Sequence, residues 1–189
     1  MAKLDKTVFY EDVVMAGFGG QGLMFIGKLL AYSAMKEGRN VTWIPSYGPE
    51  MRGGTANCTV IVSSDEIGSP TTPRPRSVIV MNNPSMEAFE PKLQNNGLLL
   101  ISSSLINRPV TRSDVRAIAV PASELAASAG NEKAANMVML GAYVALTKAV
   151  AKESIITGLK ELFGKKLDAF EANVRAFEEG MKFVNKATS

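Results

Sequence analysis

The sequence predicts an α/β fold in which helices cover a mostly parallel β-sheet. Six short apolar runs occur in the first two thirds of the chain, and most are continuously apolar rather than alternating, which favours a sheet buried on both faces. Helix-like segments separate several of these runs, and helices dominate the last third. With 189 residues and 46% hydrophobic composition, the chain can bury one sizeable core. We therefore expect residues 1–189 to form a single domain.

The elements follow one another in strand–helix–strand order. The expected strands are residues 7–16, 41–45, 55–62, 78–81, 98–102 and 115–120. The expected helices are residues 23–37, 85–95, 132–151, 154–163 and 167–186. Gly38 and Gly97 end the first two helices. This order predicts a Rossmann-like sheet with flanking helices and a helical C-terminal segment.

The C-terminal helices carry two packing signals. Glycine is unfavourable inside a helix, so Gly141 within 132–151 indicates the close approach of another element. The last helix repeats apolar residues at three- and four-residue steps, which predicts one buried stripe. That stripe docks either on its own domain or on another subunit. It consists of Leu167, Phe170, Val174, Phe177, Met181 and Val184.

Composition excludes several classes of site. Cys58 is the only cysteine and histidine is absent, so an iron–sulfur cluster held by this chain, a disulfide and a histidine-based nucleophile are excluded. We predict no metal site and no catalytic residue. The net charge of +3 is too small to indicate nucleic-acid binding. No apolar run is long enough for a membrane span or a leader, so we expect a cytoplasmic protein.

A glycine-rich turn follows the first expected strand. Gly17, Gly19 and Gly22 spell G-x-G-x-x-G between a strand and a helix, where glycines allow a tight turn and helix N–H groups attract an anion. A dinucleotide site would also need an acidic residue at the end of the next strand, and none stands there. This lowers the case for NAD or FAD. A purely structural role for the glycines stays open.

A second glycine element, Arg52-Gly53-Gly54, ends the loop before the third expected strand. We expect this loop and the glycine turn to follow neighbouring strands and therefore to lie side by side. The guanidinium of Arg52 then grips a phosphate or carboxylate, with backbone N–H groups beside it. The alternatives are a plain turn and an ion pair of Arg52 with an acidic group. Nearby stacking surface is offered by Trp43 and Tyr47.

Together these motifs resemble a known family. The stretch "GFGGQGLMFIGKLLAYSAMKEGRNVTWIPSYGPEMRGGTANCTVIVSSDEIGSP" and the later "NMVMLGA" are similar to the gamma subunit of 2-oxoacid:ferredoxin oxidoreductases, most like the 2-oxoglutarate type. The resemblance runs from about residue 13 to about residue 145. One departure is Ser77, where related chains often carry an acidic residue. The candidate cofactor-binding residues are Gly17, Gly19, Gly20, Gln21, Gly22, Arg52, Gly53 and Gly54.

The resemblance implies a subunit that is inactive alone. The assembled enzyme oxidatively decarboxylates a 2-oxoacid to an acyl-CoA and reduces ferredoxin or flavodoxin. Thiamine diphosphate and iron–sulfur clusters are then held by alpha, beta and ferredoxin-like delta subunits, and this chain helps to shape the approach of coenzyme A (CoA). Pyruvate and branched-chain 2-oxoacids remain open as substrates. The other readings are a non-catalytic binding or scaffold subunit and, less favoured, a nucleotide-dependent dehydrogenase.

Overall fold

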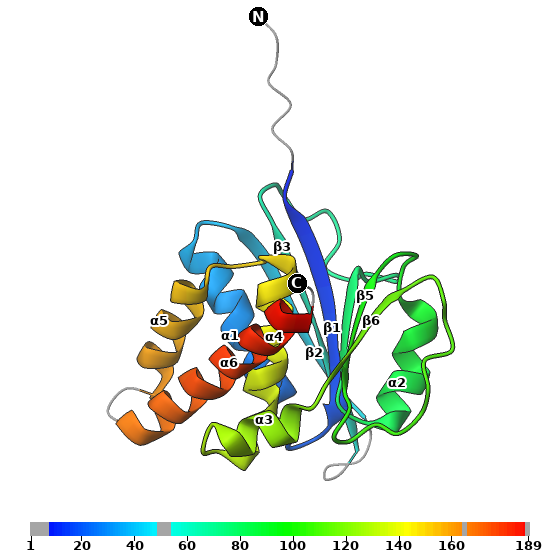
Figure 1. Cartoon of the computed structure of the whole chain (residues 1–189). Coiled ribbons are helices and arrows are strands. Elements are labelled where there is room, and N and C mark those ends of the chain that lie inside the picture. Colours follow the sequence, from blue (N-terminus) through cyan, green and yellow to red (C-terminus); the bar gives the residue numbers. More distant parts are fainter. Residues whose placement is uncertain (1–7, 49–53, 164–165, 188–189) are drawn as a thin grey trace, which may run out of the picture.

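The computed structural model describes residues 8–48, 54–163 and 166–187, which form a six-stranded sheet with helices on both faces (Figure 1). The order across the sheet is β2-β3-β1-β4-β5-β6. Strand β3 runs antiparallel to both neighbours, whereas β1, β4, β5 and β6 pair in parallel. The predicted α/β fold is confirmed, and each expected strand overlaps an observed one. The strands are β1 (Tyr10–Phe18), β2 (Asn40–Tyr47), β3 (Thr55–Ser63), β4 (Ser77–Val80), β5 (Leu98–Ser102) and β6 (Arg116–Val120).

The helices divide unequally between the two faces of the sheet. Figure 1 shows α1 and α3–α6 on one side and α2 alone on the other. A large apolar core lies on the first side, and a smaller one lies under α2. The helices are α1 (Leu23–Lys36), α2 (Asn83–Phe89), α3 (Ala122–Ser128), α4 (Ala135–Thr147), α5 (Lys152–Phe163) and α6 (Leu167–Ala187), with 3-10 turns η1 (Glu90–Lys92) and η2 (Glu132–Ala134). None of these helices is long and apolar enough to cross a membrane.

Helix boundaries differ from the sequence predictions where capping residues decide them. Helix α2 starts earlier than expected because the Asn82 side chain accepts a hydrogen bond from the Ser85 N–H at 2.7 Å. Helix α4 ends before residue 151 because Lys148 adopts a left-handed conformation with φ 56°. Helix α3 was not predicted. Its sequence, ASELAAS, is short and alanine-rich, so it shows little amphipathic periodicity.

Helices α4 and α6 cross with their backbones in contact. A Cβ atom on Gly141 would overlap with the carbonyl oxygen of Phe177, and one on Gly180 would overlap with that of Val138. The close approach predicted from Gly141 is therefore confirmed, with Gly180 as its counterpart. The crossing lets α4 lie almost wholly buried between α6 and the sheet.

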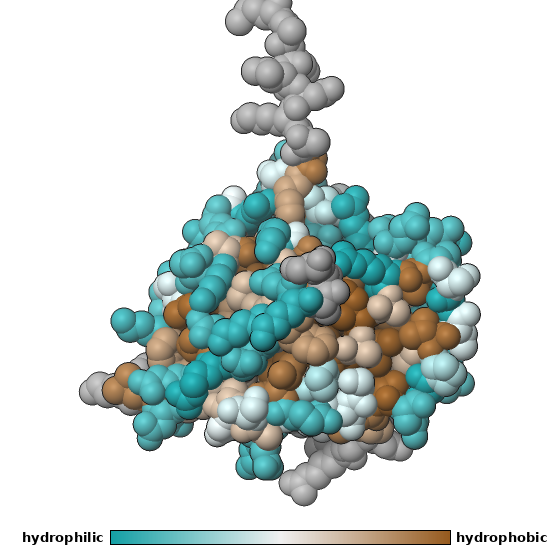
Figure 2. Space-filling view, in the orientation of Figure 1, coloured by the Kyte–Doolittle hydropathy of each residue, from teal (hydrophilic) through white to brown (hydrophobic). Residues whose placement is uncertain are grey.

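The apolar stripe of α6 docks on its own domain rather than remaining free. Phe177 and Val184 are fully buried, and Phe170, Val174 and Met181 pack against the same core. Leu167 is the exception to the predicted stripe, because it stands in the first turn of α6 and is 64% exposed. The outward face of α6 is hydrophilic (Figure 2).

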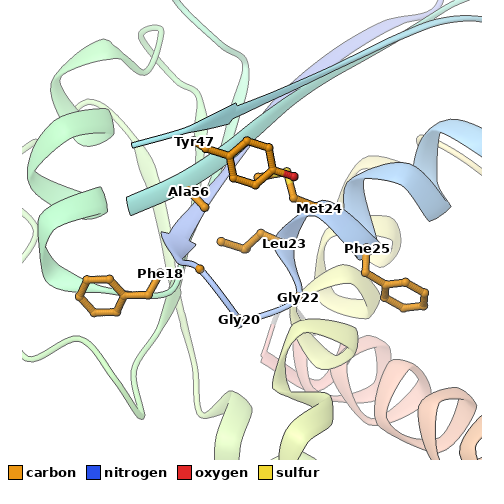
Figure 3. Close-up of a pocket in the computed structure, with 9 residues that line it drawn as sticks. Phe18, Gly20, Gly22, Leu23, Met24, Phe25, Tyr47 and Ala56 are labelled. Atoms are coloured by element: carbon orange, nitrogen blue, oxygen red, sulfur yellow. The ribbon is translucent and has the colours of Figure 1, made fainter. Parts of the chain in front are cut away.

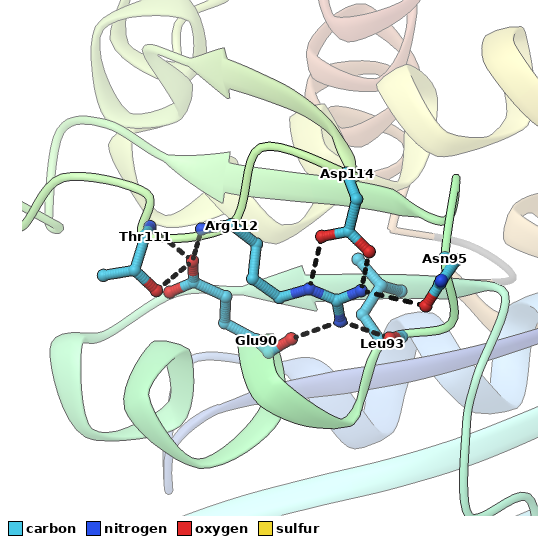
Figure 4. A network of polar contacts seen from close by, with 6 residues as sticks. All are labelled: Glu90, Leu93, Asn95, Thr111, Arg112 and Asp114. Carbon is cyan, nitrogen blue, oxygen red and sulfur yellow. Dashed lines mark hydrogen bonds and ion pairs between the residues drawn. The ribbon is translucent and has the colours of Figure 1, made fainter.

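A buried carboxylate ties the β5–β6 connection to the turn after α2 (Figure 4). Glu90 is 1% exposed and accepts hydrogen bonds from the Thr111 N–H at 2.6 Å, the Thr111 hydroxyl at 2.8 Å and the Arg112 N–H at 3.1 Å. The Arg112 guanidinium in turn donates to the carbonyl oxygens of Glu90 and Leu93 and pairs with Asp114. Burial alone raises the pKa of Glu90. The hydrogen bonds that its carboxylate accepts from Thr111 and from the Arg112 N–H outweigh this effect and hold the pKa below 4.5.

Replacing Gly141 by alanine tests the helix crossing. We expect the free energy of unfolding to fall by about 1–3 kcal/mol, because the new methyl group meets backbone that cannot rotate away. Chemical denaturation of Gly141→Ala against the parent chain measures the loss. The control is Gly68→Ala, since no heavy atom lies within 4 Å of a Cβ there. Equal stability of Gly141→Ala and the parent would mean that the helices separate without cost.

Replacing Glu90 by glutamine tests the loop anchor through pH. Because the folded pKa is depressed, the carboxylate stabilises the fold above the unfolded value of about 4.5, and this contribution is lost as pH falls through the folded pKa. We expect Glu90→Gln to be about 1–3 kcal/mol less stable at pH 7. The difference in the free energy of unfolding between the parent and Glu90→Gln should become smaller below pH 4.5.

The control for this experiment is the exposed Glu87→Gln on α2. Thermal unfolding of the three chains between acid and neutral pH measures both effects. A gap that stays constant with pH would show that the charge of Glu90 does not matter.

Candidate functional site

The glycine turn connects the end of β1 to the start of α1. Gly20 and Gly22 have φ values of 95° and 76°, which side-chain-bearing residues rarely adopt, and Gly22 is the N-cap of α1. No side chain caps this helix, and its first turn holds no acidic residue. The first N–H groups of a helix have no carbonyl partner within it, and the helix dipole is positive there. The start of α1 is therefore available to an anion.

The loop before β3 meets this turn, although not for the predicted reason. The expectation that the first two strands are neighbours is wrong, because β3 lies between β1 and β2. Since β3 runs antiparallel to β1, its beginning lies beside the end of β1, and the Gly19 N–H donates to the Gly54 carbonyl at 2.9 Å. Arg52 and Gly53 lie outside the described residues. Their roles stay predictions.

A pocket of about 270 Å³ opens at the turn (Figure 3). Figure 3 shows Leu23 directed toward the β3 end that carries Ala56, with the rings of Phe18 and Phe25 pointing to opposite sides. Tyr47 is 69% exposed at the same pocket. Every described lining residue is uncharged, so backbone groups and the Tyr47 hydroxyl supply the polarity. The lining residues are Phe18, Gly19, Gly20, Gly22, Leu23, Met24, Phe25, Tyr47 and Ala56.

The chain is similar in sequence and in fold to proteins of one known family. A family model described as pyruvate ferredoxin/flavodoxin oxidoreductase matches residues 12–183. The chain belongs to this family. A structure of the gamma subunit of a keto/oxoacid ferredoxin oxidoreductase from Geobacter sulfurreducens has a TM-score of 0.76 and 29% identity, covering 91% of this chain and 96% of that one. The resemblance inferred from the sequence motifs is confirmed.

Family relatives differ in their named 2-oxoacid. Ketoisovalerate oxidoreductase subunit VorA of Methanothermobacter thermautotrophicus is 38% identical over 97% of this chain. The chain spans only 38% of the length of VorA. The 2-oxoglutarate synthase subunit KorC of Archaeoglobus fulgidus is 29% identical over 94% of this chain and 89% of its own length. The 2-oxoglutarate type is thus among the relatives, and a ketoisovalerate type has the higher identity.

Two of the predicted site residues, Gly17 and Gln21, contact the protein interior rather than the pocket. Gly17 lies inside β1, and the Gln21 side chain is hydrogen-bonded to backbone on two sides. Trp43, expected as stacking surface, packs beside Gly27 of α1 instead. Sequence reasoning missed Met24, Phe25 and the amide of Asn136, which contacts the turn. The available signal for Asn136 was a single polar side chain at the start of an apolar helix.

The departure at Ser77 lies far from the turn, at the opposite end of β4. Its hydroxyl is buried and donates to Glu11 Oε1 at 2.5 Å. Burial raises the pKa of Glu11, and the hydrogen bond from Ser77 partly opposes this. An acidic residue at position 77 would place a second carboxylate against Glu11. Serine therefore suits this chain's own packing.

Cys58 is packed between β3 and α1 and is fully buried. Its thiol lies 3.5 Å from the Leu23 carbonyl, and burial raises the pKa of the thiol to about 12. In the described part of the chain, no group of three or more His, Cys, Asp or Glu side chains can hold a metal ion. Cys58 therefore contributes packing beside the start of α1.

Thiol labelling tests the packing of Cys58. At pH 8 we expect iodoacetamide to modify the folded chain on the order of 10³-fold more slowly than the unfolded chain, because the reactive thiolate is scarce and shielded. The same chain in guanidinium chloride provides the reference rate, and mass spectrometry counts the label. Labelling at similar rates in both states would show that α1 separates readily from β3.

Proposed function

We propose that this chain is the gamma component of a 2-oxoacid:ferredoxin oxidoreductase and that its glycine turn binds phosphate groups of CoA. The observation that carries the proposal is the uncapped start of α1, which opens with glycines into a pocket whose described lining residues are uncharged, in a chain of this family. Backbone N–H groups at a helix start bind phosphate without a charged side chain. A pocket of about 270 Å³ receives only part of CoA, and the remainder extends onto partner subunits.

The proposed reaction consumes a 2-oxoacid and CoA. The bond between the carboxylate and the carbonyl carbon breaks and CO2 leaves. The CoA thiol loses its proton to solvent as its sulfur forms the thioester, and the two electrons pass to ferredoxin or flavodoxin. Thiamine diphosphate supplies the carbanion stabilisation that decarboxylation needs. This chain orients CoA and contributes no proton-transfer group.

The iron–sulfur clusters of such an enzyme do not fit this chain. Cluster ligation takes several thiolates, whereas Cys58 is the only cysteine, and its buried thiol has a raised pKa. The clusters therefore belong to partner subunits, and the resemblance implies that thiamine diphosphate is also held by partners of the alpha, beta and delta type. The implied partners are these subunits, ferredoxin or flavodoxin, and CoA.

The substrate is a 2-oxoacid, with 2-oxoglutarate and branched-chain 2-oxoacids the favoured classes and pyruvate still open. The residues of the sequence motifs favour 2-oxoglutarate, whereas the 38% identity to the ketoisovalerate subunit VorA favours a branched-chain substrate. Because the described pocket is uncharged, it offers no side chain that distinguishes the extra carboxylate of 2-oxoglutarate. The choice is made by partner subunits, and turnover of the assembled enzyme with both acids decides it.

A nucleotide-dependent dehydrogenase is less well supported. In such enzymes a carboxylate at the end of the strand after the glycine turn holds the ribose. Here that strand, β2, is separated from β1 by β3. The remaining alternative is a scaffold role without ligand binding. In that case, substitutions in the turn should not change the affinity of the enzyme for CoA.

Replacing Met24 by glutamate tests the phosphate site. Met24 lies in the first turn of α1 and lines the pocket. A negative charge there interacts favourably with the helix dipole, so the melting temperature should not fall, but it repels phosphate. In the enzyme reconstituted with its partners, we expect KM for CoA to rise about 10-fold, equivalent to ~1.4 kcal/mol.

Met24→Gln is the matched control, since it has nearly the same shape without the charge. Its KM for CoA should stay within about 3-fold of the parent. The effect of glutamate should shrink at high salt, because the pocket mouth is open to solvent. Equal KM values for the glutamate and glutamine variants would support the scaffold alternative.

A further inference from the structure

Two side-chain amides hold the glycine turn from different elements. Gln21 Oε1 accepts a hydrogen bond from the Phe18 N–H at 2.6 Å, and Gln21 Nε2 donates to the Met81 carbonyl at 3.0 Å. Met81 directly follows β4, the strand on the other side of β1 from β3. Gln21 therefore closes the turn on itself and fixes it to the end of the neighbouring parallel strand.

Gly17 is explained by this amide. A Cβ atom on Gly17 would overlap with Gln21 Oε1 and would lie 2.8 Å from Leu23 Cδ1. The backbone of Gly17 itself continues β1 in regular pairing with Ala56 of β3. The first glycine of the motif thus makes room for a side chain of the same turn.

Asn136 holds the other end of the turn. Its Nδ2 donates to the Gly22 carbonyl at 3.2 Å, and the same carbonyl accepts the Ile26 N–H at 3.1 Å as the first hydrogen bond of α1. Asn136 is 6% exposed and lies in the first turn of α4. A Cβ on Gly22 would overlap with Asn136 Nδ2. The start of α1 is therefore fixed to α4.

The remaining glycines have few described neighbours. Among the described residues, no heavy atom lies within 4 Å of a Cβ position on Gly20, and only the Gly54 carbonyl, at 3.7 Å, approaches that of Gly19. The glycines of the motif therefore fall into two pairs. Gly17 and Gly22 leave space for the side-chain amides of Gln21 and Asn136, whereas Gly19 and Gly20 line the pocket. Such a division is suited to a ligand that must meet a rigid backbone.

We propose that Gln21 and Asn136 are positioning residues that hold the backbone N–H groups of the turn in the geometry required by the CoA phosphates. This inference rests on the proposed function, because it assumes that phosphate binds at the turn. Neither amide contacts the ligand. By fixing the turn before binding, they remove the entropy cost of ordering it when CoA arrives.

A double-mutant cycle in the assembled enzyme tests Gln21. We expect Gln21→Ala to raise KM for CoA about 10-fold while kcat at saturating CoA stays within about 2-fold. Gly17→Ala should have a similar effect, because its methyl group displaces the Gln21 amide. The variant carrying both changes should be only slightly worse than Gln21→Ala alone, since the nearest remaining atom, Leu23 Cδ1, is the end of a flexible side chain. Additive effects of Gly17→Ala and Gln21→Ala would overturn the link between them.

Asn136→Ala provides an independent test if Gln21→Ala assembles poorly. It should raise KM for CoA with little change in kcat. Asn173→Ala is the matched control, since the Asn173 side chain also donates to a backbone carbonyl, that of Ala169, but on α6 away from the turn. Lower melting temperatures with normal KM values in Gln21→Ala or Asn136→Ala would show a merely structural role and overturn the proposal.

Hydrogen exchange separates failure of this inference from failure of the proposed function. In the parent complex, CoA should protect the amides of residues 20–24. Absence of that protection would refute CoA binding at the turn, and the positioning role with it. Where CoA does protect them, Gln21→Ala should speed exchange of the hydrogen-bonded amides of Gly19 and Ile26, which flank the turn, about 10-fold in the CoA-free complex. Unchanged exchange and unchanged KM would overturn the positioning role and leave the CoA site standing.

Discussion

The contact on which the rest of the structure depends is the crossing of α4 and α6 at Gly141 and Gly180. Since neither helix carries a side chain at the crossing, the two backbones touch, and α4 lies deep between α6 and the sheet. A helix buried on all sides has no polar face, which explains why α4 is apolar almost throughout. Its position is consequently fixed by packing from every direction.

A fixed α4 determines the geometry at the N-terminal end of this helix. Asn136 lies in its first turn and reaches the Gly22 carbonyl, so the location of α4 sets where α1 begins. On the sheet side, Gln21 connects the same turn to Met81 after β4. The turn is thus held between a buried helix and a buried strand. These two contacts restrict the motion of its exposed N–H groups.

The sequence predicted those features of the fold that leave a local pattern of apolar residues or glycines, and it did not predict those that depend on tertiary contacts. Continuous apolar runs located all six strands, because burial on both faces leaves a strong pattern. Strand order was partly wrong, since the hairpin between β2 and β3 depends on the geometry of the connecting loop, which apolar patterning does not encode. The alanine-rich α3 gave no periodic signal. Glycines marked the turn correctly, yet the amides that occupy the space beside Gly17 and Gly22 come from tertiary contacts.

The absence of charged side chains from the described pocket lining has a kinetic consequence. In the proposed CoA site, backbone N–H groups would hold phosphate equally well before and during the chemical step, because the phosphates of CoA do not change charge when the thioester forms. Such uniform binding lowers KM without raising kcat. A subunit with no histidine and a single unreactive cysteine can therefore contribute to an enzyme through substrate affinity alone. Under this proposal, chemistry and substrate affinity are supplied by different subunits, and the contribution of this chain depends on the rigidity of one turn.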